Sequence, residues 1–235
     1  MNAKVVTVMD MINSETRIGV LMGGPSSERE VSFKSGNAVF AAFKSQGLDA
    51  LEIDIQKADK DYVVDLLLSY DLDLAFLALH GTFGEDGGIQ TILEEMRIPY
   101  TGSGPVACSL AMDKGASQDI FQAAGLNVPA SCVLDKKQKK AVGLKNFPLV
   151  VKPASGGSSI GLSIVDTLKE LEVAIDLAFK YDKQVIVQDY IGGREMTVGI
   201  LEDRPLNAIE IKTRRRFFDY KAKYEKGYTQ YLTPA

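Results

Sequence analysis

Short apolar runs alternate with amphipathic stretches over the first eighty residues of the chain. The apolar runs have the length of buried strands and cover residues 17–22, 50–55 and 72–79. The stretches between them carry apolar side chains at helical spacing and cover residues 30–46 and 62–68. Strands and helices that alternate in this way predict right-handed βαβ crossovers and a parallel sheet. Gly23-Gly24 and His80-Gly81 follow two of these strands, at the edge where ligands of parallel sheets bind.

The pattern changes beyond Ser109, where strands dominate. Helices are predicted over residues 112–124 and 167–181, and strands over residues 130–134, 149–152, 185–190, 196–201 and 206–211. We expect the last three strands to pair consecutively as antiparallel neighbours, through turns at residues 192–193 and 203–205. This change of pattern indicates a domain boundary near residues 103–114.

The helix predicted over residues 167–181 has the clearest start signal in the chain. Thr167 is the expected N-cap, and Glu170 follows three residues later as in a capping box. Its apolar face is expected to contain Leu168, Leu171, Ala174, Ile175 and Ala178.

Composition and charge exclude several classes of protein. The 235 residues are 46% hydrophobic and 25% charged, which is typical of a globular chain with one or two domains. A net charge of −4 argues against a dedicated nucleic-acid-binding protein, which would usually be basic. No apolar run approaches the roughly 20 residues that cross a bilayer. The first 16 residues lack the pattern of a signal peptide, and we interpret them either as a loose N-terminal extension or as the result of a start codon assigned too early. We expect a cytoplasmic protein.

The two cysteines and the longest basic run carry little functional signal. Cys108 and Cys132 have no metal-ligand spacing, and we predict buried, reduced thiols. The run over residues 136–140 is predicted to be a solvated surface.

Three polar segments have the residue types that handle phosphate groups. Residues 23–30 offer backbone N–H groups and the Glu28 carboxylate at a helix start, with a simple capped helix as the alternative. Residues 156–159 form a Gly-Gly-Ser-Ser loop after Lys152, which either wraps anionic oxygens or makes a plain hairpin turn. Residues 217–224 combine aromatic and basic side chains and predict a surface loop that closes over an anion.

Three isolated residues have both a structural and a functional interpretation. His80 is the only histidine and is either a satisfied structural residue or a ligand at the strand end. Lys114 is either a solvated helix charge or a phosphate contact, and Glu195 is either a hairpin charge or part of a site.

Taken together, these segments resemble the D-alanine–D-alanine ligases of the ATP-grasp family. The resemblance runs from about residue 17 to Ala235, with the segments in family order. They are GGPSSEREVS (residues 23–32), ALHG (78–81), GEDG (84–87), PYTGSG (99–104), MDK (112–114), KPASGGSSIG (152–161), FDY (218–220) and AKY (222–224).

The resemblance implies an α/β protein, in which an N-terminal parallel α/β (pre-ATP-grasp) domain precedes an incomplete ATP-grasp α+β region. We expect an extension over residues 1–16, a substrate-binding domain over 17–108, a central subdomain over 109–182 and the start of a C-terminal subdomain over 183–235. ATP would lie between the antiparallel sheets of the last two. Family members are longer than this chain, so we expect a C-terminally truncated form.

The resemblance also implies a site for the amino-acid substrate. Glu28 would hold the ammonium group of the first D-alanine, and His80 would lie beside that substrate. Ser158 and Tyr224 would join Glu28 in a hydrogen-bonded triad that fixes the closed loop.

The remaining implied residues would bind ATP. Lys114 and Lys152 would contact the α- and β-phosphates, and Lys223 would reach the γ-phosphate. The phosphates would be covered by Gly156, Gly157, Ser158 and Ser159. Adenine would lie against Gln188, Asp189, Tyr190 and Ile191, with Glu195 on the ribose. Gln188 departs from the family, in which glutamate is common at this position.

The implied reaction joins two D-alanine molecules through a D-alanyl phosphate, for the peptidoglycan precursor. ATP and Mg²⁺ are the implied cofactors, with Mn²⁺ as an alternative metal, and the family's metal ligands would lie beyond Ala235. D-Alanine and ATP are the expected partners, with no nucleic acid or membrane, and relatives are commonly homodimers. The pair Lys223-Tyr224 resembles enzymes whose second substrate is D-alanine rather than D-lactate or D-serine.

Two other functions stay open from the sequence. One is a nucleotide-binding fragment of such a ligase without catalysis, which the missing metal ligands favour. The other is a different ATP-grasp ligase that joins a carboxylate to an amine.

Overall fold

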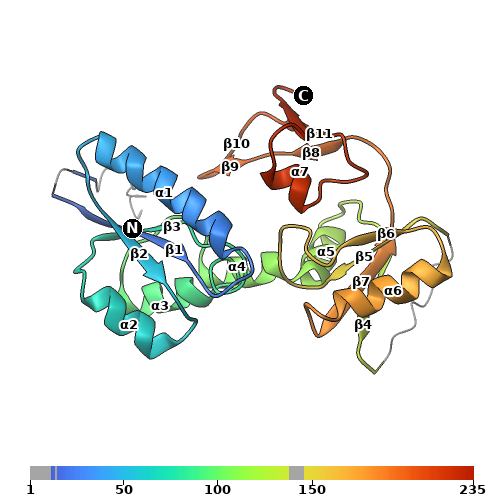
Figure 1. Cartoon of the computed structure of the whole chain (residues 1–235), viewed down its shortest axis with the longest axis horizontal. Coiled ribbons are helices and arrows are strands. Elements are labelled where there is room, and N and C mark those ends of the chain that lie inside the picture. The colour runs from blue at the N-terminus through green and yellow to red at the C-terminus, as the bar shows by residue number, and fades with distance from the viewer. Residues whose placement is uncertain (1–11, 14, 138–145) are drawn as a thin grey trace. The chain divides into compact units, whose positions relative to one another are not determined.

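The computed structural model describes residues 12–13, 15–137 and 146–235, and it divides into two compact units (Figure 1). The first unit is Met1–Met112 and the second is Asp113–Ala235. This division falls within the range 103–114 that the sequence indicated. Most of the expected extension over residues 1–16 lies outside the described residues.

The first unit is built on a three-stranded parallel sheet, which confirms the prediction from the alternating pattern. Its strands are β1 (Arg17–Gly23), β2 (Asp49–Ile55) and β3 (Leu74–Leu77), in the order β2-β1-β3. β3 is shorter than the apolar run that predicted it. The amides of Asp73 and Ala78 nevertheless donate to carbonyls of β1, so the chain follows β1 on both sides of the regular strand.

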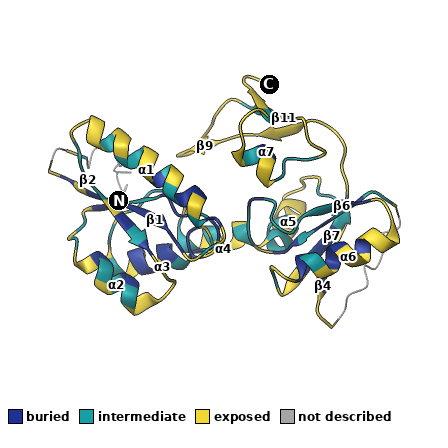
Figure 2. Cartoon of the chain, viewed as in Figure 1, coloured by how far each residue is buried: buried dark blue, intermediate teal, exposed yellow. Residues whose placement is uncertain are grey.

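Four helices complete the described part of the first unit: α1 (Arg29–Ser45), α2 (Lys60–Leu68), α3 (Gly88–Met96) and α4 (Pro105–Met112). The pattern predicted α1 and α2 and missed α3 and α4. α3 begins at the last residue of the glycine-rich segment 84–88, which is poor in helix formers. The apolar face of α3 is nevertheless buried. Aliphatic side chains of the sheet, α2 and α3 form one core, among them Leu21, Ile53, Ile55, Val63, Leu67, Ile89 and Leu93 (Figure 2).

The second unit contains a four-stranded antiparallel sheet in the order β4-β7-β5-β6. Its strands are β4 (Ser131–Asp135), β5 (Leu149–Pro153), β6 (Ser163–Val165) and β7 (Gln184–Asp189). The helices of this part are α5 (Lys114–Ala123) and α6 (Leu168–Ala178). Aliphatic residues of the sheet and of α6 form its core, among them Leu134, Leu149, Val151, Ile175, Val185 and Val187.

The start of α6 confirms the predicted N-cap but corrects its apolar face. The Thr167 side chain accepts a hydrogen bond from the Glu170 amide, and the Glu170 carboxylate accepts one from the Asp166 amide. Leu171, Ala174, Ile175 and Ala178 are buried as expected. Leu168, the first residue of the helix, is 70% exposed and does not belong to the buried core.

The pairing of the later strands matches the prediction only in part. β7 does not pair with the next strand along the chain, since it is hydrogen-bonded between β4 and β5. β8 (Glu195–Thr197) pairs antiparallel with β11 (Ile209–Thr213), as expected for the last two predicted strands, and β12 (Thr229–Leu232) pairs with the other edge of β11. β9 (Ile200–Leu201) pairs with β10 (Arg204–Pro205). We therefore propose that the central subdomain includes β7 and extends beyond the residue-182 boundary.

The aromatic and basic segment over residues 217–224 is not only a loop. Asp219 accepts a hydrogen bond from the Ala222 amide and caps a short helix, α7 (Tyr220–Tyr224). The cap offsets the poor helix propensity of the aromatic side chains, and Ala222 is buried beneath the turn.

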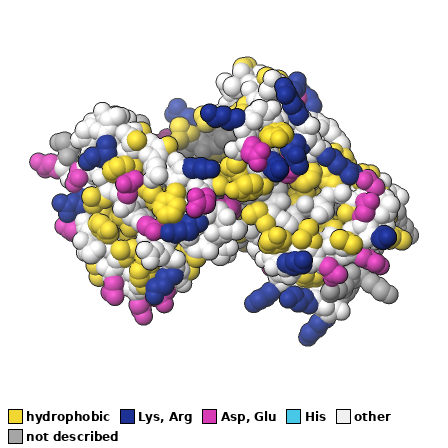
Figure 3. Space-filling view, viewed as in Figure 1, with side chains coloured by type: hydrophobic (Ala, Val, Ile, Leu, Met, Phe, Trp, Pro, Cys, Tyr) yellow, Lys and Arg dark blue, Asp and Glu magenta, His cyan; other side chains and the backbone are white. Residues whose placement is uncertain are grey.

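The surface is of mixed charge. Basic and acidic side chains are interspersed on the visible faces of both units (Figure 3). Cys108 and Cys132 are not joined by a disulfide, and both are half-buried, whereas buried thiols were predicted. Lys136 and Lys137 are exposed as expected, and the rest of that run lies outside the described residues. In the described ranges, none of the helices combines the length and apolar character that a bilayer crossing demands.

Candidate active site

The turn after β1 places Glu28 at the start of α1. Gly23 and Gly24 have φ values of 83° and 82°, which favour glycine and allow the chain to reverse above the sheet. The Glu28 amide donates to Ser26 Oγ (3.1 Å), and that hydroxyl donates to the His80 carbonyl (2.6 Å). Glu28 is buried, with 4% of its surface exposed, so its carboxylate is fixed at the carboxyl edge of the sheet.

The His80 ring is held from both sides. Its Nε2 lies 3.0 Å from Ser35 Oγ on α1, and its Nδ1 lies 3.3 Å from a Glu85 carboxylate oxygen. The hydrogen bond to Glu85 raises the pKa of His80, against an opposing effect of burial, and the charges of Glu85 and Glu28 add to the rise. Protonated imidazole is therefore stabilised at this site.

Glu28 and His80 meet around Gly81. A Cβ atom added at Gly81 would lie 2.6 Å from Glu28 Oε2, so only glycine fits beside this carboxylate. Buried Ser32 joins the two strand ends beneath them, because its hydroxyl donates to the Ala78 carbonyl (2.6 Å) and accepts from the Gly23 amide (2.9 Å). The first unit thus brings together the two residues predicted to bind the amino-acid substrate.

In the second unit, three lysines line one pocket of about 210 Å³. Lys114 comes from α5, Lys152 from β5 and Lys223 from α7. The remaining wall is mostly the polar loop that follows β5, with Gly156, Gly157, Ser158 and Ser159. Residues far apart in the sequence therefore converge where the resemblance implied phosphate contacts.

Burial and mutual repulsion perturb two of these lysines. Burial, and to a smaller extent the charges of Lys152 and Lys223, together lower the pKa of Lys114 to about 8, against the opposing effect of Asp182 and Asp113. Burial also lowers the pKa of Lys152. The described lining of this pocket includes three lysines and polar loop residues, which favours an anionic ligand, and such a ligand would raise both pKa values.

Two hydroxyls tie the loop over this pocket to the segment around α7. Ser158 Oγ and Tyr224 OH lie 2.7 Å apart, and Ser159 Oγ donates to the Phe218 carbonyl (2.9 Å). Ser158 and Ser159 have φ values of 53° and 57°, which cost energy for any residue except glycine. The two hydrogen bonds help to hold this strained backbone.

The strand end predicted to face adenine is the carboxyl end of β7. Gln188 Oε1 accepts from Gln118 Nε2 (3.0 Å), which fixes its amide against α5. The Asp189 amide donates to the Ala130 carbonyl, while the Tyr190 ring and Ile191 are more exposed. These four residues mark the end of the sheet, and their contact with a nucleotide stays a prediction.

Glu195 lies at the start of β8. Partial burial raises the pKa of its carboxyl, and the charge of Lys223 lowers it. The contact of Glu195 with the ribose stays a prediction.

The implied triad of Glu28, Ser158 and Tyr224 also stays a prediction, since Glu28 belongs to the first unit and Ser158 and Tyr224 belong to the second.

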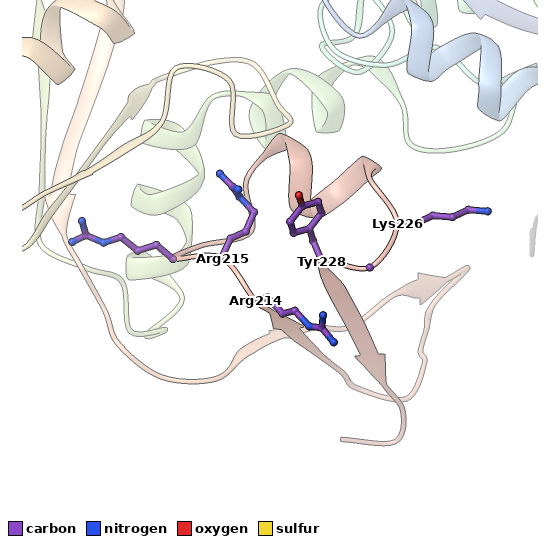
Figure 4. A pocket seen from close by; sticks show the side chains of 6 residues that line it. Arg214, Arg215, Lys226 and Tyr228 are labelled. Atoms are coloured by element: carbon purple, nitrogen blue, oxygen red, sulfur yellow. The ribbon is translucent and has the colours of Figure 1, made fainter.

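A second, more open pocket of about 600 Å³ lies beside β11 and β12 (Figure 4). Two of the four basic residues that line it are paired with carboxylates. Arg215 pairs with the helix-capping Asp219 (2.6 Å), and Arg216 pairs with Asp166 (2.8 Å). Lys226 extends away from Arg214 and Arg215 in Figure 4. The Arg215–Asp219 pair braces the start of α7, the helix that carries Lys223 and Tyr224.

Sequence reasoning missed several residues that build the site. Ser26, Ser35 and Glu85 orient Glu28 and His80, and Gln118 orients Gln188. Glu85 lay within a segment that resembled the family, but no local pattern pairs it with His80.

The described residues contain no group of three or more His, Cys, Asp or Glu side chains suited to a metal ion. The described residues therefore offer no cage of three or more such side chains for Mg²⁺, which is often bound by one or two carboxylates together with substrate phosphates.

Comparisons with known proteins agree with this geometry. Residues 65–103 match the family model "D-ala D-ala ligase N-terminus", and residues 120–235 match "D-ala D-ala ligase C-terminus". A D-alanine–D-alanine ligase of Geotalea uraniireducens (strain Rf4) is 48% identical over 221 residues, which cover 93% of this chain and 70% of that protein.

Two solved structures are also similar. The D-alanine–D-alanine ligase of Bacillus anthracis complexed with ATP has a TM-score of 0.77 and 34% identity, over 92% of this chain and 70% of that one. The VanG D-Ala:D-Ser ligase of Enterococcus faecalis has a TM-score of 0.73 and 30% identity, over 94% and 76% respectively.

Proposed function

The chain belongs to the D-alanine–D-alanine ligase family, and we infer from this membership that it joins two D-alanine molecules at the expense of ATP. Its α/β architecture is that of the ATP-grasp ligases. The product, D-alanyl-D-alanine, supplies the end of the peptidoglycan precursor in this family.

The reaction has two chemical steps. A carboxylate is a poor electrophile, so an oxygen of the first D-alanine attacks the γ-phosphorus of ATP, and ADP leaves. The amine of the second D-alanine then attacks the acyl carbon of the D-alanyl phosphate. Inorganic phosphate leaves, the nitrogen loses a proton and a peptide bond remains. Positioning and charge neutralisation carry most of the catalysis of such a phosphoryl transfer.

In the first unit, Glu28 binds the ammonium group of the first D-alanine, and His80 lies beside that substrate. The burial of the Glu28 carboxylate supports this role, because an ion pair with a substrate ammonium group is stronger where water is excluded. The raised pKa of His80 supports a protonated ring, held by Ser35 and Glu85, whose positive charge lies beside the substrate.

In the second unit, Lys114 and Lys152 bind the α- and β-phosphates, and Lys223 binds the γ-phosphate. Residues 156–159 cover the phosphates and exclude water, which would otherwise hydrolyse the acyl phosphate. Gln188 to Ile191 contact adenine, and Glu195 contacts the ribose. The convergence of the three lysines in one pocket is the observation that carries this proposal.

The experiment combines calorimetry with a non-hydrolysable ATP analogue and a phosphate-release assay with D-alanine and ATP. Binding together with D-alanine-dependent phosphate release, and a dipeptide product, is the expected result. Binding without turnover would support the alternative, a nucleotide-binding module. Turnover with another amine in place of D-alanine would support a different ATP-grasp ligase.

Several finer properties belong to the same proposal. Mg²⁺, or Mn²⁺ in its place, is the expected metal, with ligands outside the described residues. The protein is expected in the cytoplasm and as a homodimer. D-Alanine is the proposed second substrate because of Lys223 and Tyr224, although one similar structure is a D-Ala:D-Ser ligase. Parallel assays with D-alanine, D-serine and D-lactate as acceptors test this choice.

A further inference from the structure

Asp182 is a half-buried carboxylate in the turn between α6 and β7. It is not one of the residues proposed above to bind D-alanine or ATP. Its Oδ2 accepts a hydrogen bond from the Ser155 amide at 2.6 Å, across 27 positions of sequence. Its Oδ1 accepts from the Gln184 amide at 3.2 Å. One carboxylate thus joins the end of β5 to the start of β7.

The segment that Asp182 holds is the one that orients Lys114. The Ala154 amide donates to the Gln184 carbonyl (3.0 Å), so two successive amides are tied to the same turn. The Lys114 ammonium group in turn donates to the Ala154 carbonyl (3.3 Å) and to the Gly156 carbonyl (2.6 Å). Residues 154–156 therefore lie between Asp182 on one side and Lys114 on the other.

We propose that Asp182 is a positioning residue for the lysine pocket: it fixes the backbone at Ser155 and thereby the two carbonyls that aim Lys114 at the phosphates. This inference rests on the proposed function of that pocket. Asp182 is not among the residues that line the pocket, so it acts through the backbone and not by contact with a ligand.

The charge of Asp182 has a second effect on the same lysine. Lys114 faces two other cations, Lys152 on β5 and Lys223 on α7, and the compensating carboxylates are Asp182 and Asp113. The Asp182 charge raises the pKa of Lys114 against the lowering by burial and by the two lysines. Removal of Asp182 would leave more of the Lys114 side chain neutral at a given pH.

The test compares Asp182→Asn, which keeps the shape and removes the charge, with Asp182→Ala, which removes both. Glu172→Gln is the matched control, since Glu172 is exposed on α6 and has no hydrogen bond or ion pair among the described residues. Two NMR measurements do not depend on catalysis: amide hydrogen exchange at Ser155 and the titration of Lys114 Nζ. We expect about tenfold faster Ser155 exchange in Asp182→Ala, because a charge-assisted hydrogen bond is lost. We expect Lys114 to titrate at lower pH in both variants.

Nucleotide binding supplies the readout that a merely structural role would not move. We expect Asp182→Ala to bind the ATP analogue about tenfold more weakly. The KM for ATP should rise more than the KM for D-alanine, and the weakening should grow as the pH rises through the Lys114 pKa. Asp182→Asn should show a smaller loss, and Glu172→Gln none.

The outcomes separate this inference from the proposed function. Faster Ser155 exchange with unchanged nucleotide affinity would overturn the inference while the ligase proposal stands. Unchanged exchange and an unchanged Lys114 titration would overturn it whatever the binding result. If the unaltered chain binds no nucleotide, the proposed function fails, and the exchange and titration data then decide alone whether Asp182 positions Lys114.

Discussion

The hydrogen bond between Ser158 and Tyr224 lends itself to a double-mutant cycle. The two hydroxyl oxygens lie 2.7 Å apart. Tyr224→Phe removes the phenol hydroxyl and leaves the ring, and Ser158→Ala removes the serine hydroxyl. A neutral hydrogen bond contributes about 1 kcal/mol net, which is roughly a fivefold change in an equilibrium. Ser158 also holds a φ of 53°, a conformation that costs a non-glycine residue about 1–2 kcal/mol. Without the hydrogen bond, the loop over the lysine pocket should open more often.

The assay is steady-state ligation, with dipeptide and phosphate measured in the same reaction. Each single variant should lower dipeptide formation about fivefold and increase the phosphate released per dipeptide, since an open loop admits water to the acyl phosphate. The double variant should be no worse than the poorer single variant, which gives a coupling energy of about 1 kcal/mol. Ser158→Gly is the control for strain: it lacks the hydroxyl but accepts the positive φ, so it should outperform Ser158→Ala. Strictly additive losses would show that the two hydroxyls act independently and would refute this reasoning.

Three further predictions test single residues. Lys152→Ala should slow phosphoryl transfer on the order of 10²-fold, because a buried cation beside the phosphates is lost, and near-normal turnover in a rapid-quench assay would refute its role. Glu85→Gln should lower the pKa of His80, which is readable by NMR because His80 is the only histidine. Since the folded-state pKa of His80 is raised, its contribution to stability is fully present below its ordinary value of 6.5 and is lost as the pH rises through the raised value. In Glu85→Gln, urea unfolding should show a weaker pH dependence, and an unchanged His80 titration would exclude the pairing. Gly81→Ala should destabilise the chain by about 1–3 kcal/mol, since the φ is 68° and the new methyl group would meet the Glu28 carboxylate. Chemical denaturation measures this, and a wild-type midpoint would contradict it.

The elements with local signals were predictable. Regular alternation of apolar runs gave β1, β2 and the parallel sheet, because buried parallel strands and their crossover helices have distinct periods. Thr167 and Glu170 marked the start of α6 since a cap is a contact between residues three apart. The lysines and the loop after β5 were identified through segments that resemble a known family, and the structure places them in one pocket.

The errors concern contacts between distant residues. The order of Gln184–Asp189 along the chain suggested a neighbour downstream, but this strand pairs with β4 and β5, which precede it. Leu168 was assigned to the apolar face of α6, yet this first residue of the helix is exposed, because the local period does not show where the packing partners lie. A short helix appears at Tyr220–Tyr224 because Asp219 caps it and Arg215 holds the cap.

The sequence by itself therefore determined the local elements, the family resemblance and the residue types that can neutralise a triphosphate. Only the tertiary structure decided which side chains meet: Glu85 with His80, Tyr224 with Ser158, and Asp182 with Ser155. The physical reason is range. Periodicity and capping depend on neighbours within about four residues, whereas pKa values and the aim of a catalytic lysine depend on charges and carbonyls that only folding brings within a few ångströms.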